Sequence, residues 1–557
     1  MLILASVVMF SACSSGLKPL SSSYVKASPQ PLEAVGGKVP VTINAIFPEK
    51  WFNKNASVEI IPVLRYDGGE AWGTTYNYQG EKVAGNGHVI SQKNGANVTM
   101  TSGFKYVPEM DKSDLYLRFT ATVDGKKVEL PDMKIGNGVL ATSALADAGF
   151  ENPAIAPDAF QRIIKEKYEA DIMFLIQQAE LRSSELRKSD IEEWKGIVEN
   201  ANMTPNQSVN VEISAYASPD GGYELNEKLA AQREKNTDQY VKKELKKVAA
   251  NAPVSARYTA QDWEGFKQLV EKSNIQDKNI ILSVLSSYSD LEEREKQIKN
   301  ISSVFSVLAE EILPQLRRSR LTANVEIIGK SDAEISQLAA SSPKSLPLEE
   351  LLYAASLADT NDAKAVIYSA VAHIYPDDYR AYNNLGTIAF EKGNFVEAEK
   401  YFDKAQSLAA NKSPEINYNY ALIALIAGDK QSAQQFLGNA AGVPGLDNAL
   451  GLVALQSGDY DKAASLLSGT KSNNAALAQI MTKNYSGAMS ILNAVQKPDA
   501  TTSYLKAIVG ARTNNVNEVV SNLKQSISLD RSIADKAVND LEFVKYVTNA
   551  QFLNVVK

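Results

Sequence analysis

The chain has 557 residues and a net charge of −7, with 44% hydrophobic and 22% charged residues. This is an ordinary globular mixture, and the length indicates three or four domains. Acidic and basic residues are interspersed without a basic patch, which argues against nucleic-acid binding. The two histidines and one cysteine are too few to indicate a Cys/His zinc site or a Cys–His catalytic pair.

The N-terminus indicates export. Residues 2–9 form an apolar run that is too short to span a bilayer, which is typical of a secretory signal. The small residues directly before Cys13 resemble the bacterial lipobox, in which the cysteine is lipid-modified and becomes the mature N-terminus. The alternative is a plain signal peptide with an incidental cysteine. We expect residues 1–13 to be a signal peptide with a lipobox, and Cys13 to anchor the protein in the outer membrane.

The segment after Cys13 predicts the orientation of the anchored protein. Residues 14–36 are rich in Ser, Pro and Gly, which predicts a flexible tether. Cys13 is not followed by the acidic cluster that surface-exported lipoproteins of the Bacteroidetes type often carry. This favours a protein that faces the periplasm.

Residues 37–150 have the pattern of a β-sandwich. Apolar residues alternate with period two in the runs 39–43, 57–64 and 115–123. Gly-containing turn sequences such as Asp67-Gly68-Gly69 separate the runs. Regularly spaced short strands with such turns predict a sandwich of about 110 residues.

The central part of the chain predicts a strand, a tight turn and a helix. Val209, Val211 and Ile213 alternate as in a strand, and an amphipathic helix begins near Asn226. With Leu229 and Arg233, this pattern resembles the C-terminal OmpA-like domain, in particular its divergent Bacteroidetes members. The resemblance covers residues 165–332 and implies an α/β domain. The resemblance also implies that helical residues 264–312 are the long insertion that such members carry before the last strand, which we expect at 322–329.

The OmpA-like resemblance also implies a binding site. The family binds peptidoglycan by holding diaminopimelate between an Asp in the turn and an Arg on the helix, and an Arg offers a bidentate fork for a carboxylate. The Arg falls on Arg233, but the Asp position is Ser218, which carries no charge. Asp220 is a substitute if the turn is reshaped. The alternative is that the fold is a scaffold in which Arg233 makes a structural hydrogen bond.

The C-terminal part of the chain repeats itself. Small and large residues recur as in the tetratricopeptide repeat (TPR), a helix pair of about 34 residues. In the clearest unit they are Tyr382, Leu385, Gly386, Ala398, Phe402 and Ala405. A turn containing Gly393, Gly428 or Gly458 recurs between the helices, and the pattern predicts an all-α TPR solenoid over residues 346–540.

TPR stacks present a concave face that normally binds peptides or protein segments. The candidate positions on this face are Asn383, Asn417, Tyr418 and Tyr420. For each of them singly we favour a structural role, with the asparagines capping turns and the tyrosines packing between helices. We expect the face as a whole to bind protein partners.

No catalytic motif points to an enzyme. The sequence has no Gly-x-Ser-x-Gly elbow, P-loop, Rossmann fingerprint or His-Glu-x-x-His motif, and it indicates no cofactor and no metal. A carboxylate-pair glycosidase is the one class that sequence alone leaves open. We expect a non-enzymatic outer-membrane lipoprotein that links the envelope to the cell wall or holds protein partners. The alternative is an accessory subunit of an outer-membrane assembly or secretion complex without peptidoglycan binding.

Overall fold

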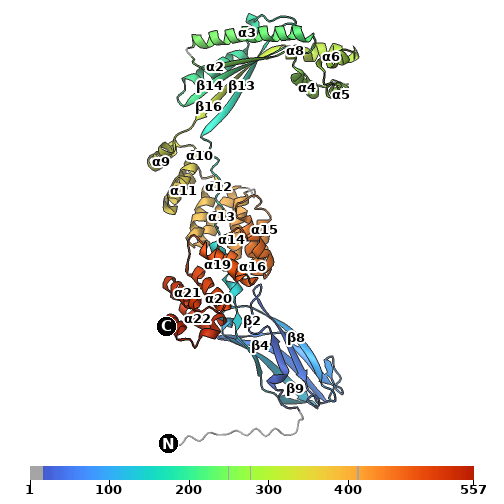
Figure 1. Cartoon of the computed structure of the whole chain (residues 1–557), viewed down its shortest axis with the longest axis vertical. Coiled ribbons are helices and arrows are strands. Elements are labelled where there is room, and N and C mark those ends of the chain that lie inside the picture. Colours follow the sequence, from blue (N-terminus) through green and yellow to red (C-terminus); the bar gives the residue numbers. More distant parts are fainter. Residues whose placement is uncertain (1–16, 249, 276–277, 301, 410–412) are drawn as a thin grey trace. The chain divides into compact units, whose positions relative to one another are not determined.

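The structure is a computed structural model that describes residues 17–248, 250–275, 278–300, 302–409 and 413–557. The chain forms two compact units (Figure 1). One consists of Met1–Asp158 together with Ala358–Lys557 and is called the split unit; the other, Ala159–Leu357, interrupts it and is called the inserted unit. The expected multidomain architecture, sheet-rich at the N-terminus and helical at the C-terminus, is confirmed. Cys13 lies outside the described residues.

The N-terminal part of the split unit is made of two main sheets packed face to face. A sheet in the order β1-β3-β8 covers a larger one whose path is β10-β9-β4-β6-β7, with β11 beside β9 and β5 beside β4. Alternate residues such as Val41, Ile43 and Leu117 fill the space between them. The elements are η1 (Ser22–Tyr24), β1 (Val25–Ser28), β2 (Leu32–Glu33), β3 (Lys38–Phe47), β4 (Ala56–Tyr66), β5 (Gly69–Trp72), β6 (Tyr76–Gly80), β7 (His88–Ile90), β8 (Ala96–Lys105), η2 (Pro108–Asp111), β9 (Ser113–Val123), β10 (Lys126–Glu129), β11 (Met133–Asn137) and β12 (Val139–Leu140).

Two predicted boundaries of the sandwich are wrong. The expected tether, residues 14–36, belongs to the sandwich from Leu17 onward. Leu17 and Leu20 are buried, and β1 adds to β3 because Val25 and Ala27 alternate inward. At the other end, the sandwich ends at β12 rather than at residue 150. Residues 141–158, here called the strap, leave the sheets with only two short turns, η3 (Thr142–Leu145) and η4 (Ala148–Phe150).

The C-terminal part of the split unit is a stack of helix pairs. Gly393, Gly428 and Gly458 lie between paired helices at φ of 77°, 75° and 85°, a conformation that glycine adopts without strain. Small residues allow each pair to approach closely, as where Gly386 faces the Phe402 ring. The helices are α11 (Asn361–Ile374), α12 (Tyr379–Glu391), α13 (Phe395–Ala409), α14 (Pro414–Ile426), α15 (Lys430–Leu437), α16 (Leu446–Ser457), α17 (Tyr460–Leu466), α18 (Asn473–Met481), α19 (Tyr485–Asn493), α20 (Ala500–Arg512), α21 (Val516–Leu529), α22 (Ile533–Asn539), η7 (Leu541–Tyr546) and α23 (Ala550–Val556).

The inserted unit contains a four-stranded sheet in the order β13-β16-β14-β15. β16 is antiparallel to both of its neighbours, whereas β14 and β15 are parallel and are connected through α3. Helices α2 and α3 pack on the face that carries Val211, Ile213 and Leu321. The elements of this part are β13 (Ile163–Met173), α1 (Ser183–Leu186), α2 (Ser189–Met203), β14 (Gln207–Tyr216), α3 (Tyr223–Lys247), β15 (Val254–Thr259) and β16 (Arg318–Ile328).

The remaining helices of the inserted unit form two groups. The predicted helical insertion before the last strand has its own small apolar core around Phe266, Val270 and Leu316. The second group follows β16, and there Tyr353 of α10 stacks on Phe160 with ring centroids 4.3 Å apart. The repeats were expected from residue 346, but α10 belongs to the inserted unit. The helices are α4 (Trp263–Lys272), α5 (Lys278–Ser287), α6 (Leu291–Asn300), α7 (Ser302–Val307), η5 (Leu308–Ile312), α8 (Leu313–Leu316), α9 (Asp332–Ser341), η6 (Pro343–Ser345) and α10 (Leu348–Ser356).

Candidate functional site

The turn after β14 carries the residues that the sequence pointed to. Asn226, in the first turn of α3, fixes the loop by donating to the carbonyl oxygens of Ser218 (3.0 Å) and Gly221 (2.8 Å). The geometry of this strand, turn and helix therefore depends on one buried amide. It brings Ser218, Asp220 and Arg233 to one end of the sheet.

Arg233 is the most enclosed charged group of this site. Its side chain is 1% exposed, and its guanidinium lies over the Phe174 ring at 4.9 Å. It donates to three backbone carbonyl oxygens, of Tyr216 (2.8 Å), Gln178 (3.0 Å) and Leu175 (3.3 Å). Burial and, to a smaller extent, the nearby charge of Arg317 lower the pKa of Arg233 to about 10. The guanidinium thus holds the loop after β13 against the end of β14.

Asp220 is also engaged within the chain. Arg317, at the end of the helical insertion, donates to its carboxylate at 2.9 Å, and the Ser218 hydroxyl donates to the other carboxylate oxygen. Arg317 reaches the Ser218 hydroxyl as well, at 3.2 Å. The side chains of Arg317 and Asp220 are only 11% and 17% exposed. The anion and the cation that a zwitterionic ligand needs are present, but each already has a protein partner.

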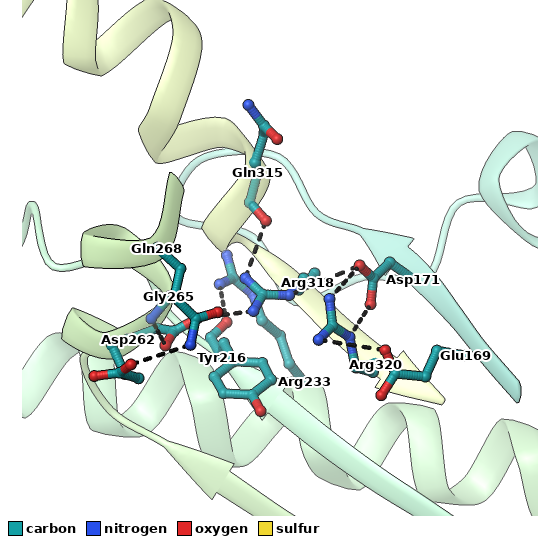
Figure 2. A network of polar contacts seen from close by, with 11 residues as sticks. Glu169, Asp171, Tyr216, Arg233, Asp262, Gly265, Gln268, Gln315, Arg318 and Arg320 are labelled. Carbon is teal, nitrogen blue, oxygen red and sulfur yellow. Dashed lines mark hydrogen bonds and ion pairs between the residues drawn. The ribbon is translucent and has the colours of Figure 1, made fainter. Parts of the chain in front are cut away.

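A network of charges continues from this site over the sheet face that α2 and α3 leave open (Figure 2). Arg320 makes a bidentate pair with Asp171, at 3.0 and 3.1 Å. Arg318 lies over the Tyr216 ring at 4.5 Å and pairs with Asp262 at 2.9 Å. The charges of this face alternate in sign and form ion pairs, although the buried Asp262 Oδ2 and Arg318 Nε atoms make no hydrogen bond.

The second candidate site is the surface of the helical repeats that contacts the strap, here called the groove; it carries Asn383, Asn384, Asn419 and Asn474. Their side chains are at most 1% exposed. Asn384, Asn419 and Asn474 each lie 14 residues before the small residue of the following helix, which is Ala398, Ala433 or Ala488. They therefore occupy equivalent positions on α12, α14 and α18. The repeat places three identical amides along one line.

The strap occupies this groove. Asn384 accepts from the Ala156 N–H (2.8 Å) and donates to the Ala156 carbonyl (3.1 Å). Asn419 makes the same pair with Ala154, at 2.7 and 2.8 Å. Asn474 makes it with Asp147, at 3.1 and 2.8 Å. Each amide thus reads both backbone groups of one strap residue.

Further contacts complete the seat of the strap. Asn383 donates to the Ala154 carbonyl at 2.9 Å, and Asn474 donates to the Glu151 carboxylate at 2.9 Å. Burial raises the pKa of Glu151, whose side chain is almost enclosed. Where the strap leaves the groove, Arg380 donates to the Asp158 carbonyl at 3.0 Å. The segment that contains Pro153 and Pro157 is therefore a fixed part of the split unit.

The four predicted groove positions divide into two groups. Asn383 has a structural role, as favoured for it, but it holds the strap through the Ala154 carbonyl instead of capping a turn. The other three have structural contacts: Asn417 donates to the Ser413 carbonyl (2.9 Å), Tyr418 is buried in the core, and Tyr420 stacks on Phe436 at 5.2 Å. Sequence reasoning missed Asn384, Asn419 and Asn474, although their 14-residue offset from the small residue of the next helix was a usable signal.

Comparison with known proteins supports the repeats alone. Residues 379–412 match the family model of the tetratricopeptide repeat. This segment is a tetratricopeptide repeat. No curated protein matches the chain. The expected OmpA-like character of residues 165–332 stays a prediction.

Several solved TPR structures are similar to the chain at a low level. A tetratricopeptide repeat protein from Parabacteroides merdae is 13% identical, with 38% of this chain and 91% of that chain covered and a TM-score of 0.29. Pseudomonas aeruginosa PilF is 15% identical, with 38% and 98% covered and a TM-score of 0.27. The Cut9–Hcn1 hetero-tetramer of the APC/C is 15% identical, with 66% of this chain and 83% of that chain covered and a TM-score of 0.31. Likeness at this level carries no functional information.

Two further observations concern the described residues only. No helix there combines the length and the apolar character that crossing a membrane requires. No group of three or more His, Cys, Asp or Glu side chains is arranged there to hold a metal ion.

Proposed function

We propose that the protein is a non-enzymatic lipoprotein, anchored through Cys13 in the outer membrane and facing the periplasm, that serves as an accessory subunit of an outer-membrane assembly or secretion complex. The TPR repeats point to protein partners in general. In this proposal the inserted unit is an OmpA-like scaffold in which the residues at the wall-binding positions, Arg233 and Asp220, bind groups of the protein itself.

One observation supports the accessory role over the cell-wall link. Arg233, which the family's pattern assigns to the carboxylate of diaminopimelate, has all of its recorded hydrogen bonds on backbone carbonyls and is 1% exposed. A ligand that recruited it would take one donor from each of these part-buried carbonyls, of which the Leu175 carbonyl also accepts from the Gln178 N–H at 3.2 Å. A carbonyl left without a donor costs up to about 1–3 kcal/mol. The Arg317–Asp220 pair would have to open as well. Binding of a peptidoglycan zwitterion at this site would therefore have to offset the free energy lost when these hydrogen bonds and this ion pair break.

Fractionation followed by affinity purification of the full-length protein tests the proposal. We expect the wild type to partition with the outer membrane, Cys13→Ala to leave it, and an outer-membrane β-barrel protein to co-purify in stoichiometric amount. We expect no sedimentation with purified sacculi. Sedimentation with sacculi that Arg233→Lys abolishes, without a co-purifying barrel, would establish the cell-wall link instead.

A further inference from the structure

The groove recognises mainly the backbone of the strap; its asparagines make one side-chain contact, from Asn474 to the Glu151 carboxylate. Asn384, Asn419 and Asn474 each use the acceptor and the donor of one side-chain amide on the N–H and C=O of a single strap residue. These backbone groups are common to all residues other than proline. Over residues 152–157, which form neither helix nor turn, the groove therefore suits an extended polypeptide, and its hydrogen bonds there depend little on the sequence.

Size selection comes from the strap positions that face inward. Ala154 and Ala156 are 9% and 1% exposed, while Ile155 between them is 52% exposed. This alternation is that of an extended chain with one face in the groove. A larger side chain at either alanine has no free volume to enter, because close-packed interiors do not absorb extra atoms without displacement. The fitting ligand is an extended peptide with small residues at two positions separated by one residue.

The strap is tied at both ends. Ser143 donates to the Ala34 carbonyl of the sandwich at 2.6 Å, and Arg512 reaches the Thr142 hydroxyl at 3.4 Å. At the other end, Arg380 holds the Asp158 carbonyl. A ligand tethered in this way has an effective concentration in the millimolar range or above. A free peptide at micromolar concentration competes poorly with it.

We propose that residues 147–158 are a resident ligand of the TPR groove, which excludes other peptides and directs protein partners to surfaces outside the groove. The inference holds wherever the protein lies in the cell and does not depend on its role in an assembly complex. The strap then has a second effect. By lying in the groove, where a partner peptide would otherwise bind, it also links the sandwich to the repeats.

The test is a titration of the full-length protein with a fluorescent synthetic peptide of residues 146–158. We expect no saturable binding to the wild type up to about 100 μM, because the tethered strap outcompetes the peptide. In the Ala154→Asp/Ala156→Asp variant, two buried carboxylates expel the strap from an intact groove. That variant should bind the peptide, and adding Asn419→Ala should weaken this binding about tenfold, as expected for the loss of two to three hydrogen bonds. Ile155→Asp changes an exposed residue and should behave like the wild type.

Two results overturn the proposal directly. Wild-type protein that binds the peptide as tightly as the double variant shows that the strap does not exclude ligands. A folded double variant that does not bind shows that the emptied groove is not a peptide site. If the double variant does not fold, hydrogen exchange on the wild type decides. We expect the amides of Asp147, Ala154 and Ala156 to exchange as slowly as those of α14; exchange at the rate of an open loop, with α14 still protected, contradicts a resident ligand.

Discussion

The turn after β14 and the groove of the repeats both carry the polar groups of a binding site, and in both the chain itself satisfies them. They differ in the origin of the occupant. At the turn, Arg233 binds carbonyls 17 to 58 residues away within the inserted unit. In the groove, the asparagines bind a segment that is 228 to 327 residues away in sequence. Binding chemistry inferred from a motif therefore says which groups are present, and only the tertiary structure says whether they are free.

The two sites also differ in the kind of energy that holds them. Arg233 is a buried charge with neutral partners, so its removal leaves unsatisfied carbonyls and a cavity. The groove asparagines are neutral and pair reciprocally with neutral backbone groups. A buried charge usually costs more to disturb than a neutral amide does. Substitution of Arg233 should therefore lower stability more than substitution of a groove asparagine does.

Arg233→Ala should have the largest effect. We expect the inserted unit to lose about 3–4 kcal/mol of stability, because the carbonyls of Tyr216 and Gln178 lose the Arg233 donor and the space over Phe174 empties. Hydrogen exchange of the β14 and α3 amides measures this without requiring the whole chain to unfold in one step. Arg187→Ala, on an exposed residue, is the matched control. A stable Arg233→Ala protein that has only lost binding to sacculi would contradict the structural role and make Arg233 a ligand group.

Asn419→Leu should rank second, at about 2–3 kcal/mol in the split unit. Leucine has nearly the same shape, but it leaves the buried Ala154 N–H without an acceptor and removes one of the two donors to the Ala154 carbonyl, so that only Asn383 remains. Thermal denaturation and the exchange rate of the Ala154 amide should both report the loss. Asn439→Leu, an exposed asparagine of the same repeats, should leave both unchanged. Equal behaviour of the two variants would mean that the groove does not hold the strap.

Glu151 lets pH distinguish the groove from the turn. Its pKa is raised by burial, which the Asn474 hydrogen bond only partly offsets. The folded protein therefore binds a proton more readily than the unfolded chain, and this group's contribution to stability falls as the pH rises from the ordinary glutamate pKa through the raised one. Glu151→Gln should be more stable than the wild type at neutral pH, with a difference that narrows as the pH is lowered through that window.

Urea unfolding of the split unit at several pH values measures this difference. Burial also raises the pKa of Asp111 and Asp540, so the variant keeps part of the wild-type pH dependence. Glu397→Gln, on an exposed carboxyl, serves as the control. A Glu151→Gln variant with a stability difference that does not change with pH would show that Glu151 is ionised without penalty in its seat.

The parts of the fold that sequence predicts are those in which local pattern and burial agree. Period-two alternation of apolar residues predicted β3, β4, β9 and β14, and the recurring small residues predicted the helix pairs. β15 was missed because its residues, from Val254 to Thr259, are mostly exposed and show no alternation. The strap was missed for a different reason. Ala154 and Ala156 are small, flanked by prolines and typical of a linker, and nothing local to them shows that a ladder of amides far along the chain will enclose them.

The site residues follow the same division. Asn226 and Arg233 were found because they belong to one short motif. Arg317, which neutralises Asp220, lies 97 residues from it, at the end of an insertion whose length sequence patterns do not fix. A motif can identify the cationic and anionic residues of a binding site without showing that a distant arginine is already paired with the anionic one.

The smallest effect should come from the open face of the sheet, where charges lie in contact with water. Asp171→Asn removes the bidentate partner of Arg320, but the two side chains are 32% and 34% exposed. Screened pairs of this kind contribute about 0.5 kcal/mol, and less at high salt. We expect a loss of about this size in the inserted unit at low salt, and almost none at about 1 M salt. A loss as large as that of Arg233→Ala, unchanged by salt, would mean that the charge network of Figure 2 is as buried in solution as Arg233 is, because only desolvated pairs escape screening.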